Sequence, residues 1–363
     1  MGSARASVWY SPADNAAMPY TLLIPHLWWS PDVATEAYRD LAVPMLETAL
    51  ARATRRSYAA IGWEAWLCQA FEVERQRDWP IAPLTLTIDG GDPGSAYWLR
   101  ADPVHLRAHR DRLVLADSSA FEISRDEADA FVGVLNTHFS ADGLRFSAPV
   151  PQRWYLRLDS EPEIATSLLD DAAGASIDPH LPKGAAAMQW HSVMNEAQML
   201  LHGCAVNAAR EAREELPVNG VWLWGGGRST PVTGRHFATV TANDPLSLSL
   251  GAHGDIPAAP LDGDGECWMR RLPPTSRGET HLAVLDPLVS CARRGDLAAW
   301  RDALMQLERR WIAPLMAALK QGRIDALVLV VPGAEACARF ELARPGLLKF
   351  WRPHRALSLH FGV

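Results

Sequence analysis

The sequence lacks the cysteine patterns, charge blocks and long apolar runs that mark several classes of protein. Its five cysteines stand singly and form no Cys-x-x-Cys pair, so neither a zinc knuckle nor a redox dithiol is indicated. The net charge is −7 without a basic block, and nothing favours nucleic acid as a partner. Because no signal peptide opens the chain and no apolar run approaches membrane-spanning length, we expect a cytoplasmic, bacterial-type protein with no membrane partner.

Catalytic motifs with sharp signatures are missing as well. The chain contains no Gly-x-x-x-x-Gly-Lys-Ser/Thr phosphate loop, no GxSxG elbow and no HExxH helix. His105 and His109 have a spacing that could pair them on a metal, but a catalytic or structural site needs further ligands. Two histidines surrounded by arginines are more typical of a solvated face.

The pattern of strands and helices predicts an α/β protein with an insertion. Strand–helix alternation characterises both ends of the 363-residue chain, while the pattern changes after Pro80 and returns at Pro217. We therefore expect a core formed by residues 1–80 and 216–363, with residues 81–215 as an inserted α+β cap and connecting helix. In such cores ligands bind beyond the carboxyl ends of strands, which directs attention to the turns after Ile24, Trp224, Leu285 and Val331.

Several segments carry specific expectations. Apolar runs predict strands at residues 20–25, 84–88, 221–224 and 327–331. A long helix is predicted from about Trp190 to Glu215, and another from Asp296 to Lys320 that breaks near Pro314.

The stretch Trp222-Leu223-Trp224 followed by Gly225, Gly226, Gly227 and Arg228 is the most unusual in the chain. Glycines can adopt positive φ and permit close approach of a ligand or of another backbone. Consecutive N–H groups in such a turn can bind an anion, and Arg228 would add positive charge. The alternative is a tight strand exit in which the glycines only permit packing.

The order of the polar motifs resembles that of a known family. Asp178-Pro179-His180, a helix with Asn195-Glu196, then Arg210, Asn219 and the Trp-Leu-Trp-Gly-Gly-Gly stretch, together resemble the archaeal-type cofactor-independent phosphoglycerate mutases of the alkaline phosphatase superfamily. The Met194-Asn195-Glu196 and Trp-Leu-Trp-Gly-Gly-Gly motifs are similar to those of little-characterised bacterial proteins known as RpfE-type regulators. The resemblance runs from about residue 20 to residue 350 and is strongest from 97 to 231.

This resemblance implies an alkaline-phosphatase-like core, a cap domain, two divalent metals and a phosphorylated serine intermediate. The sequence departs from that machinery. An acidic ligand is implied at the end of the first strand, where Pro25-His26 stands, and a serine nucleophile is implied after Gly62, where Trp63 stands. The later ligand clusters fall on Val289, Ser290, Ala292, Arg293, Ala334 and Glu335. Asp286 can replace one ligand, but a single carboxylate does not make a two-metal site.

The substrate-binding side of the resembled family is better preserved. Its candidate ligand-binding residues here are Asp178, His180, Arg210, Asn219, Gly225, Gly226, Gly227 and Arg228, which we expect to line a cleft between core and cap. We predict a catalytically degenerate relative without metal or other cofactor that binds a phosphorylated or anionic small molecule. Two alternatives stay open: an active phosphotransferase or phosphatase with relocated catalytic groups, and a structural or interaction protein without a small ligand.

Overall fold

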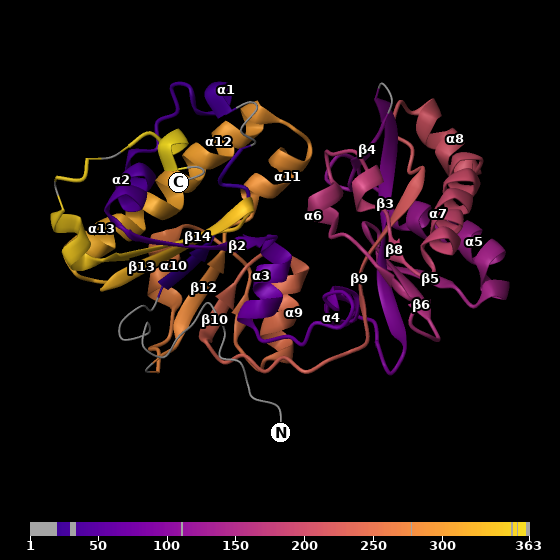
Figure 1. Cartoon of the computed structure of the whole chain (residues 1–363), viewed down its shortest axis with the longest axis horizontal. Coiled ribbons are helices and arrows are strands. Elements are labelled where there is room, and N and C mark those ends of the chain that lie inside the picture. The colour runs from indigo at the N-terminus through magenta and orange to yellow at the C-terminus, as the bar shows by residue number, and fades with distance from the viewer. Residues whose placement is uncertain are drawn as a thin grey trace. The chain divides into compact units, whose positions relative to one another are not determined.

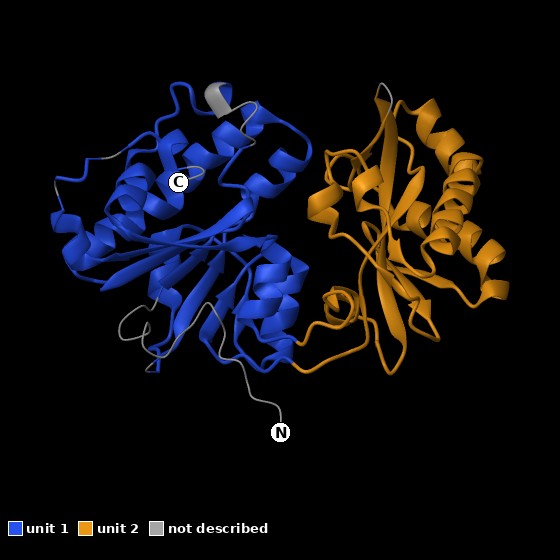
Figure 2. Cartoon of the chain, in the orientation of Figure 1, with its two compact units in different colours: residues 1–73, 232–363 blue, residues 74–231 orange. Residues whose placement is uncertain are grey.

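The protein is described by a computed structural model that covers residues 20–29, 34–109, 112–276, 278–349, 351–353 and 355–360. The chain divides into two compact units (Figure 2). Unit 1 combines both ends, Met1–Val73 and Val232–Val363, and unit 2 is the middle segment, Glu74–Pro231. Within the described residues, no helix is both long and apolar enough to cross a membrane.

Unit 1 is built on a seven-stranded sheet in the order β11-β10-β12-β1-β13-β14-β2 (Figure 1). The strands are β1 (Tyr20–Leu23), β2 (Thr54–Ile61), β10 (Phe237–Thr241), β11 (Ala258–Ala259), β12 (Thr280–Val284), β13 (Ala326–Val331) and β14 (Gly333–Ala343). Strand β1 pairs in parallel with β12 on one side and with β13 on the other. The expectation that the first strand and the strand at residues 327–331 share a sheet is therefore confirmed.

Helices cover both faces of this sheet. They are α1 (Ala34–Tyr38), α2 (Pro44–Arg52), α3 (Trp63–Ala70), α9 (Pro245–His253), α10 (Gly265–Arg271), α11 (Pro287–Arg293), α12 (Leu297–Leu307), the π-helical turn η4 (Glu308–Ile312), α13 (Ala313–Gln321), and the 3-10 turns η5 (Arg344–Leu348) and η6 (Leu357–His360). Helices α2, α12 and α13 lie on one face, and α3 and α9 lie on the other (Figure 1). The result is a three-layer α/β/α core.

The predicted break near Pro314 is present as the π-helical turn between α12 and α13. Proline has no N–H and cannot continue a regular hydrogen-bond ladder, so the regular helix is interrupted next to Pro314. The buried Glu308 at this turn accepts hydrogen bonds from the backbone N–H groups of Met45 (2.6 Å) and Leu46 (2.9 Å). Its carboxylate thereby caps α2, whose own N-cap residue, Val43, supplies no side-chain bond.

Unit 2 contains an antiparallel sheet with strands in the order β4-β3-β6-β5, and β9 also pairs with β3 (Figure 1). The strands are β3 (Tyr97–His109), β4 (Arg112–Ala116), β5 (Arg145–Val150), β6 (Arg153–Leu158) and β9 (Gly220–Gly227), with β7 (Ile164–Ala165) and β8 (Lys183–Gly184) forming a separate pair. The helices are α4 (Ile81–Ile88), α5 (Arg125–Phe139), α6 (Leu169–Ala172), α7 (Ala187–His202) and α8 (Ala205–Ala212), with the 3-10 turns η2 (Ser140–Asp142) and η3 (Asp178–His180).

Adjacent residues of β6 point to opposite faces of this second sheet. Trp154 packs against Phe131 of α5, whereas Tyr155 packs against Ala82 and Leu86 of α4. The α+β character expected for the inserted segment is therefore observed.

Three local expectations were wrong. The segment 84–88, expected as a strand, forms most of helix α4, because an apolar run as short as this does not reveal its period. Its Thr85 and Thr87 hydroxyls bond back to carbonyls of the same helix. The long helix from 190 to 215 is two helices, α7 and α8, separated at Gly203-Cys204.

The third correction concerns the boundary of the insertion. The units divide after Val73 and after Pro231, whereas the change of pattern placed the boundaries at residues 81 and 216. Consequently β9, expected in the core, belongs to unit 2. Its partner is β3, with Trp222 opposite Asp102 and Gly220 opposite Val104.

A buried ion pair lies at the centre of unit 2. The Arg100 guanidinium donates to Asp102 through Nε (3.1 Å) and Nη2 (2.6 Å), and both residues are almost completely buried. Tyr155 and Trp224 present their rings to Arg100 at 5.1 and 5.2 Å. Asp102 also accepts hydrogen bonds from the Trp224 indole N–H (2.7 Å) and from the Trp154 backbone N–H (3.2 Å). One carboxylate therefore connects three strands.

We expect Asp102→Asn to destabilise the protein by about 3–5 kcal/mol, because it leaves the Arg100 charge buried without a counter-ion. Urea unfolding followed by circular dichroism measures the change. The control is Arg157→Ala, which breaks the exposed Arg157–Asp159 pair (3.0 Å) and should cost less than about 1 kcal/mol. Equal losses in the two variants would contradict a central role for the buried pair.

Candidate functional site

The carboxyl ends of six strands meet at one edge of the sheet in unit 1. Strands β11, β10, β12, β1 and β13 are parallel, and β14 runs antiparallel to β13. Strand β2 is antiparallel to β14 and therefore points in the same direction as β13. Residues that follow these strands gather at this edge, where open α/β sheets bind their ligands. They include His26, Glu64, Asp244 and Asp286.

His26 follows β1 with an unusual backbone conformation. Its φ of 54° lies in the left-handed region, which residues other than glycine adopt infrequently. The Trp300 indole N–H donates to the His26 carbonyl (2.9 Å), which helps to hold this conformation. Strained residues of this kind concentrate at functional sites. Here it marks the turn after Ile24, one of the four turns singled out by the sequence.

Glu64 follows β2 at the first turn of helix α3 and is buried. Its Oε1 lies 3.3 Å from Nη2 of Arg293, the last residue of α11. Both side chains are largely withdrawn from solvent, so the attraction between them is weakly screened. A positive and a negative charge thus face each other where the family resemblance implies metal ligands and a nucleophile.

Asp244 and Asp286 follow β10 and β12, which are neighbours in the sheet. Asp244 caps α9 through a bond from the Ser247 N–H to its Oδ1 (2.8 Å), while its buried Oδ2 has no hydrogen-bond partner among the described residues. Burial raises the pKa of the Asp244 carboxyl to about 6, and the negative charge of Asp286 acts in the same direction. Hydrogen bonds from Ser247 lower the pKa but do not cancel this rise. Burial also raises the pKa of Asp286.

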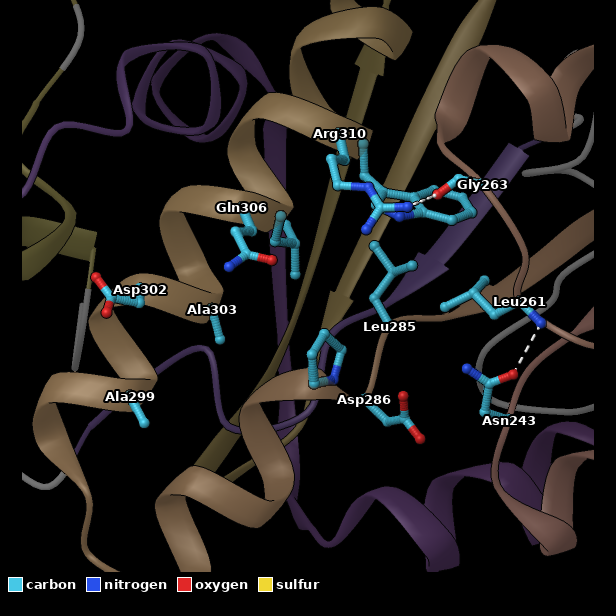
Figure 3. Close-up of a pocket in the computed structure, with 13 residues that line it drawn as sticks. Asn243, Leu261, Gly263, Leu285, Asp286, Ala299, Asp302, Ala303, Gln306 and Arg310 are labelled. Carbon is cyan, nitrogen blue, oxygen red and sulfur yellow. Dashed lines mark hydrogen bonds between the residues drawn. The ribbon is translucent and has the colours of Figure 1, made fainter.

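A pocket of about 420 Å³ opens at the same edge, beside Asp286 (Figure 3). Its lining comes from the segments after β10 and β12, from helix α12 and from the π-helical turn. These residues are Asn243, Leu261, Gly263, Leu285, Asp286, Pro287, Ala299, Asp302, Ala303, Gln306, Leu307, Arg310 and Trp311. The turn after Leu285, where the sequence indicated chemistry, therefore borders a cavity of ligand size.

The residues at this edge do not fit the two divalent metals that the family resemblance implies. Among the described residues, no three His, Cys, Asp or Glu side chains are grouped so that they could hold a metal ion. Asp244 and Asp286 contribute two carboxylates, and the nearby Glu64 is already bound to a guanidinium. A two-metal centre needs more oxygen or nitrogen ligands than this.

The residues predicted to bind a ligand all lie in unit 2, where Arg210 has internal partners. Arg210 is buried, donates through Nε to the Leu216 carbonyl (2.9 Å), and pairs with Glu127 at 3.1 Å. Asn219 exchanges two hydrogen bonds with the backbone of Leu106, at 2.6 and 2.9 Å. These two polar side chains therefore stabilise the fold of unit 2.

The glycines form part of strand β9 instead of a turn after it, which corrects the prediction. Trp98 pairs with Gly227 and Arg100 with Trp224, so two residues of β9 oppose one of β3. Gly225 has a φ of 64°, as a glycine bulge requires. A Cβ on Gly226 would lie 2.7 Å from the Tyr97 hydroxyl oxygen. The glycines accommodate packing against neighbouring strands and α4.

The remaining predicted residues have local partners in unit 2. Arg228 is exposed, and its guanidinium donates to the Ser95 carbonyl. Arg210 contacts the segment before β9 and Arg228 follows β9, so these two arginines stand at opposite ends of the strand. Asp178 and His180 belong to η3, where the Asp178 carboxylate accepts a bond from the Ser176 hydroxyl (3.3 Å).

Sequence comparison connects this arrangement to a family of enzymes. The chain is 29% identical over 159 residues to a probable 2,3-bisphosphoglycerate-independent phosphoglycerate mutase of Geobacter sulfurreducens, with 43% of this chain and 39% of the relative covered. It is 26% identical over 178 residues to the 2,3-bisphosphoglycerate-independent phosphoglycerate mutase of Methanosarcina mazei, with 46% and 44% covered. Its homologues are cofactor-independent phosphoglycerate mutases.

The matches to these two curated mutases span less than half of their length, and no protein-family model matches the chain. Among solved structures, the PH0037 protein of Pyrococcus horikoshii superposes with a TM-score of 0.51 at 11% identity, covering 90% of this chain and 88% of the other. This likeness concerns the fold. The expected alkaline-phosphatase-like α/β core of this mutase-like chain is confirmed.

The sequence did not place Asp244 or the Glu64–Arg293 pair in the candidate site of this mutase-like chain. Asp286 was considered only as a replacement ligand. The signal that the sequence contains is the position of each residue shortly after a strand. Glu64 follows β2, and the two aspartates stand within three residues of the ends of β10 and β12. Strand β2 was not predicted, so its contribution to the carboxyl edge could not be anticipated.

Asp244→Asn should flatten the pH dependence of stability between pH 4 and 6. Because the folded-state pKa of about 6 exceeds the ordinary 3.8, the folded chain binds more protons than the unfolded chain in this window, and unfolding free energy falls as pH rises. The difference corresponds to roughly 3 kcal/mol. Asp286 acts with the same sign and remains in the variant.

Urea midpoints measured at intervals from pH 4 to pH 6.5 test this expectation. The matched control is Asp255→Asn, since the Asp255 side chain is 92% exposed. A variant at 244 whose stability changes with pH in parallel with the wild type would show that this carboxyl does not titrate as stated.

Gly226→Ala should destabilise the protein by about 1–3 kcal/mol, because the added Cβ would lie 2.7 Å from both Leu99 Cδ2 and the Tyr97 hydroxyl oxygen. The control is Gly133→Ala in α5, where nothing lies within 4 Å of the added atom and helix propensity favours alanine by about 0.5–1 kcal/mol. Thermal unfolding measures both. A Gly226 variant as stable as the wild type would remove the packing explanation for this glycine.

Proposed function

We propose that this chain is a catalytically degenerate relative of the phosphoglycerate mutases that acts as a binding or regulatory protein. The observation that carries the proposal is the Glu64–Arg293 ion pair at the carboxyl edge. In the mechanism implied by the resemblance, two metal ions neutralise the transferring phosphoryl group while a serine attacks it. Here a guanidinium brings the positive charge, and Trp63 stands at the position implied for the serine.

The covalent route of phosphoryl transfer that the resemblance implies requires a protein nucleophile that can form a bond to phosphorus and release it again. The Trp63 side chain has no such atom, and the adjacent Glu64 is neutralised by Arg293. A buried, hydrogen-bonded carboxylate of this kind is stabilised as an ion and is a poor nucleophile. The side chains at this edge therefore favour recognition over catalysis.

The regulatory part of the proposal comes from the motifs shared with RpfE-type regulatory proteins, Met194-Asn195-Glu196 and the Trp-Leu-Trp-Gly-Gly-Gly stretch. Both lie in unit 2. The glycine stretch has a structural role in β9, so the resemblance there concerns the architecture of unit 2. The pocket in unit 1 supports a role in binding a small molecule.

An active phosphotransferase or phosphatase is the second candidate, and one observation favours it. Asp244 and Asp286 lie at the ends of adjacent parallel strands, and each has a raised pKa. Paired carboxyl groups with raised pKa values occur in sites of acid–base chemistry. If these groups catalyse a reaction, the activity must depend on Asp286, whose side chain reaches the pocket.

The decisive experiment measures turnover and metal content of the full chain. Interconversion of 3-phosphoglycerate and 2-phosphoglycerate, and hydrolysis of p-nitrophenyl phosphate, are assayed with Mn²⁺, Mg²⁺ or Co²⁺. The Methanosarcina mazei mutase is the positive control. We expect no turnover above buffer and less than one metal ion per chain. Trp63→Ser should also stay inactive, because Arg293 still stands where a metal ligand is implied.

Metal-dependent turnover that disappears on chelation and in Asp286→Asn would replace the proposal by the enzymatic alternative. A thermal-shift screen that includes phosphorylated metabolites addresses the remaining distinction, because a ligand that binds only the folded state raises the melting temperature. A chain that responds to no metabolite in such a screen would instead be an interaction protein.

A further inference from the structure

The pocket beside Asp286 has a composition unlike that of a phosphate site. Its walls are mainly apolar, formed by Leu261, Leu285, Pro287, Ala303 and Leu307 together with Ala299 and Trp311. A pocket of about 420 Å³ falls within the range of small-molecule sites. One wall contains the π-helical turn η4, and such turns occur frequently at functional sites. The irregular turn places Arg310 and Trp311 at the cavity.

Two opposite charges border this cavity without pairing with each other. Asp286 is half-buried and Arg310 is exposed. Neither forms an ion pair with a described residue, and Arg310 uses only Nη2, which donates to the Gly263 carbonyl (2.6 Å). The close-up shows Asp286 and Arg310 on different sides of Leu285 (Figure 3). Each charge is therefore available to a complementary group of a ligand.

The other polar groups of the lining are neutral or directed elsewhere. The Asn243 side chain accepts a bond from the Leu261 N–H through Oδ1 (3.0 Å), and its amide nitrogen stays available as a donor. Gln306 presents a second amide to the pocket, whereas the Asp302 carboxylate points away from Leu285 and Asp286 (Figure 3). The charges on either side of Leu285 are thus those of Asp286 and Arg310, with apolar surface between them.

We propose that this pocket binds a small zwitterion that carries an ammonium group and a carboxylate on an apolar body, as free amino acids do. The ammonium group pairs with Asp286, the carboxylate pairs with Arg310, and the apolar body packs against Leu285 and Pro287. A ligand that fills the pocket removes the charges of Asp286 and Arg310 from water. A ligand that pairs with both of them is favoured, because a charge that is buried without a partner is costly. The inference rests on the proposed binding function and specifies its site and ligand class.

A phosphorylated ligand fits this pocket less well. A phosphate near Arg310 would also meet the negative charge of Asp286 across a small cavity, where repulsion is weakly screened. Carboxylate and guanidinium groups match in geometry and can form two parallel hydrogen bonds. One N–H of Arg310 Nη2 bonds to Gly263, and its other N–H can form such a pair together with Nε or Nη1. The same pocket rejects simple anions and simple cations, since each leaves one protein charge unmatched.

Isothermal titration of the full chain tests the inference with a defined panel. The probes are L-leucine, L-phenylalanine, γ-aminobutyrate and 6-aminohexanoate, which vary the apolar body and the separation of the two charges. N-acetyl-leucine lacks the ammonium group, leucinamide lacks the carboxylate, and inorganic phosphate and 3-phosphoglycerate represent anions. We expect at least one zwitterion to bind, with a dissociation constant at least tenfold lower than that of its two blocked analogues.

Substitutions identify the pocket as the site of binding. Asp286→Asn and Arg310→Gln should each weaken binding of the selected zwitterion at least tenfold. The matched controls are Asp255→Asn, whose side chain is 92% exposed, and Arg309→Gln, the neighbour of Arg310. Both residues lie outside the lining, and these changes should alter affinity less than twofold. Thermal unfolding of all four variants confirms that they are folded.

Three outcomes would overturn the inference: no zwitterion of the panel binds at 10 mM, both substitutions leave affinity unchanged, or 3-phosphoglycerate binds in an Arg310-dependent manner while zwitterions do not. In none of them does the chain gain catalytic turnover. The proposed function fails separately, through metal-dependent mutase or phosphatase activity, so the two failures are distinguishable.

Discussion

The parallel pairing of β1 with both β12 and β13 is the constraint on which unit 1 depends. This four-residue strand comes from the beginning of the chain and lies between two strands from its final third. The core sheet therefore needs segments that are distant in sequence, and residues 74–231 between them form a separate unit. The carboxyl ends of six strands meet at a single edge, where His26, Glu64, Asp244 and Asp286 follow them.

At that edge, charged side chains of the protein balance one another. A phosphoryl-transfer centre concentrates negative charge and balances it with metal ions. In this chain, Arg293 balances Glu64 within the protein, while burial raises the pKa of the Asp244 carboxyl to about 6. Asp286 and Arg310 form no ion pair with a described residue. In the proposed complex, the ligand in the cavity between them carries the opposite charges.

Unit 2 illustrates how residues that suggest binding can be structural. Arg210 and Asn219 resemble ligand-binding residues in sequence, yet their donors meet backbone carbonyls at 2.9 Å. The ion pair of Arg100 with Asp102 joins strands β3, β6 and β9 through a single carboxylate. An arginine has the same donors whether its partner is a phosphate, a carboxylate or a carbonyl oxygen. Its sequence context therefore does not reveal which partner it has.

Much of the architecture was determined by the sequence alone. Apolar runs identified β1, β9 and β13, the change of pattern identified an inserted module, and Pro314 identified the interruption between α12 and α13. These features depend on local composition and on the period of hydrophobic residues, which are readable from the chain. The first strand and the strand at 327–331 could be assigned to one sheet because strands alternating with helices form parallel sheets.

Tertiary structure decided the rest, because those features depend on contacts between segments distant in sequence. The run at 84–88 lies in helix α4, which packs against β3 and β9. Strand β9 belongs to unit 2 because it pairs with β3. Glu64 meets Arg293 across 229 positions of the chain, and Asp286 meets a cavity whose other walls come from α12 and η4. Strand order and helix packing determine which of these residues lie close together, and neither can be predicted from the local sequence.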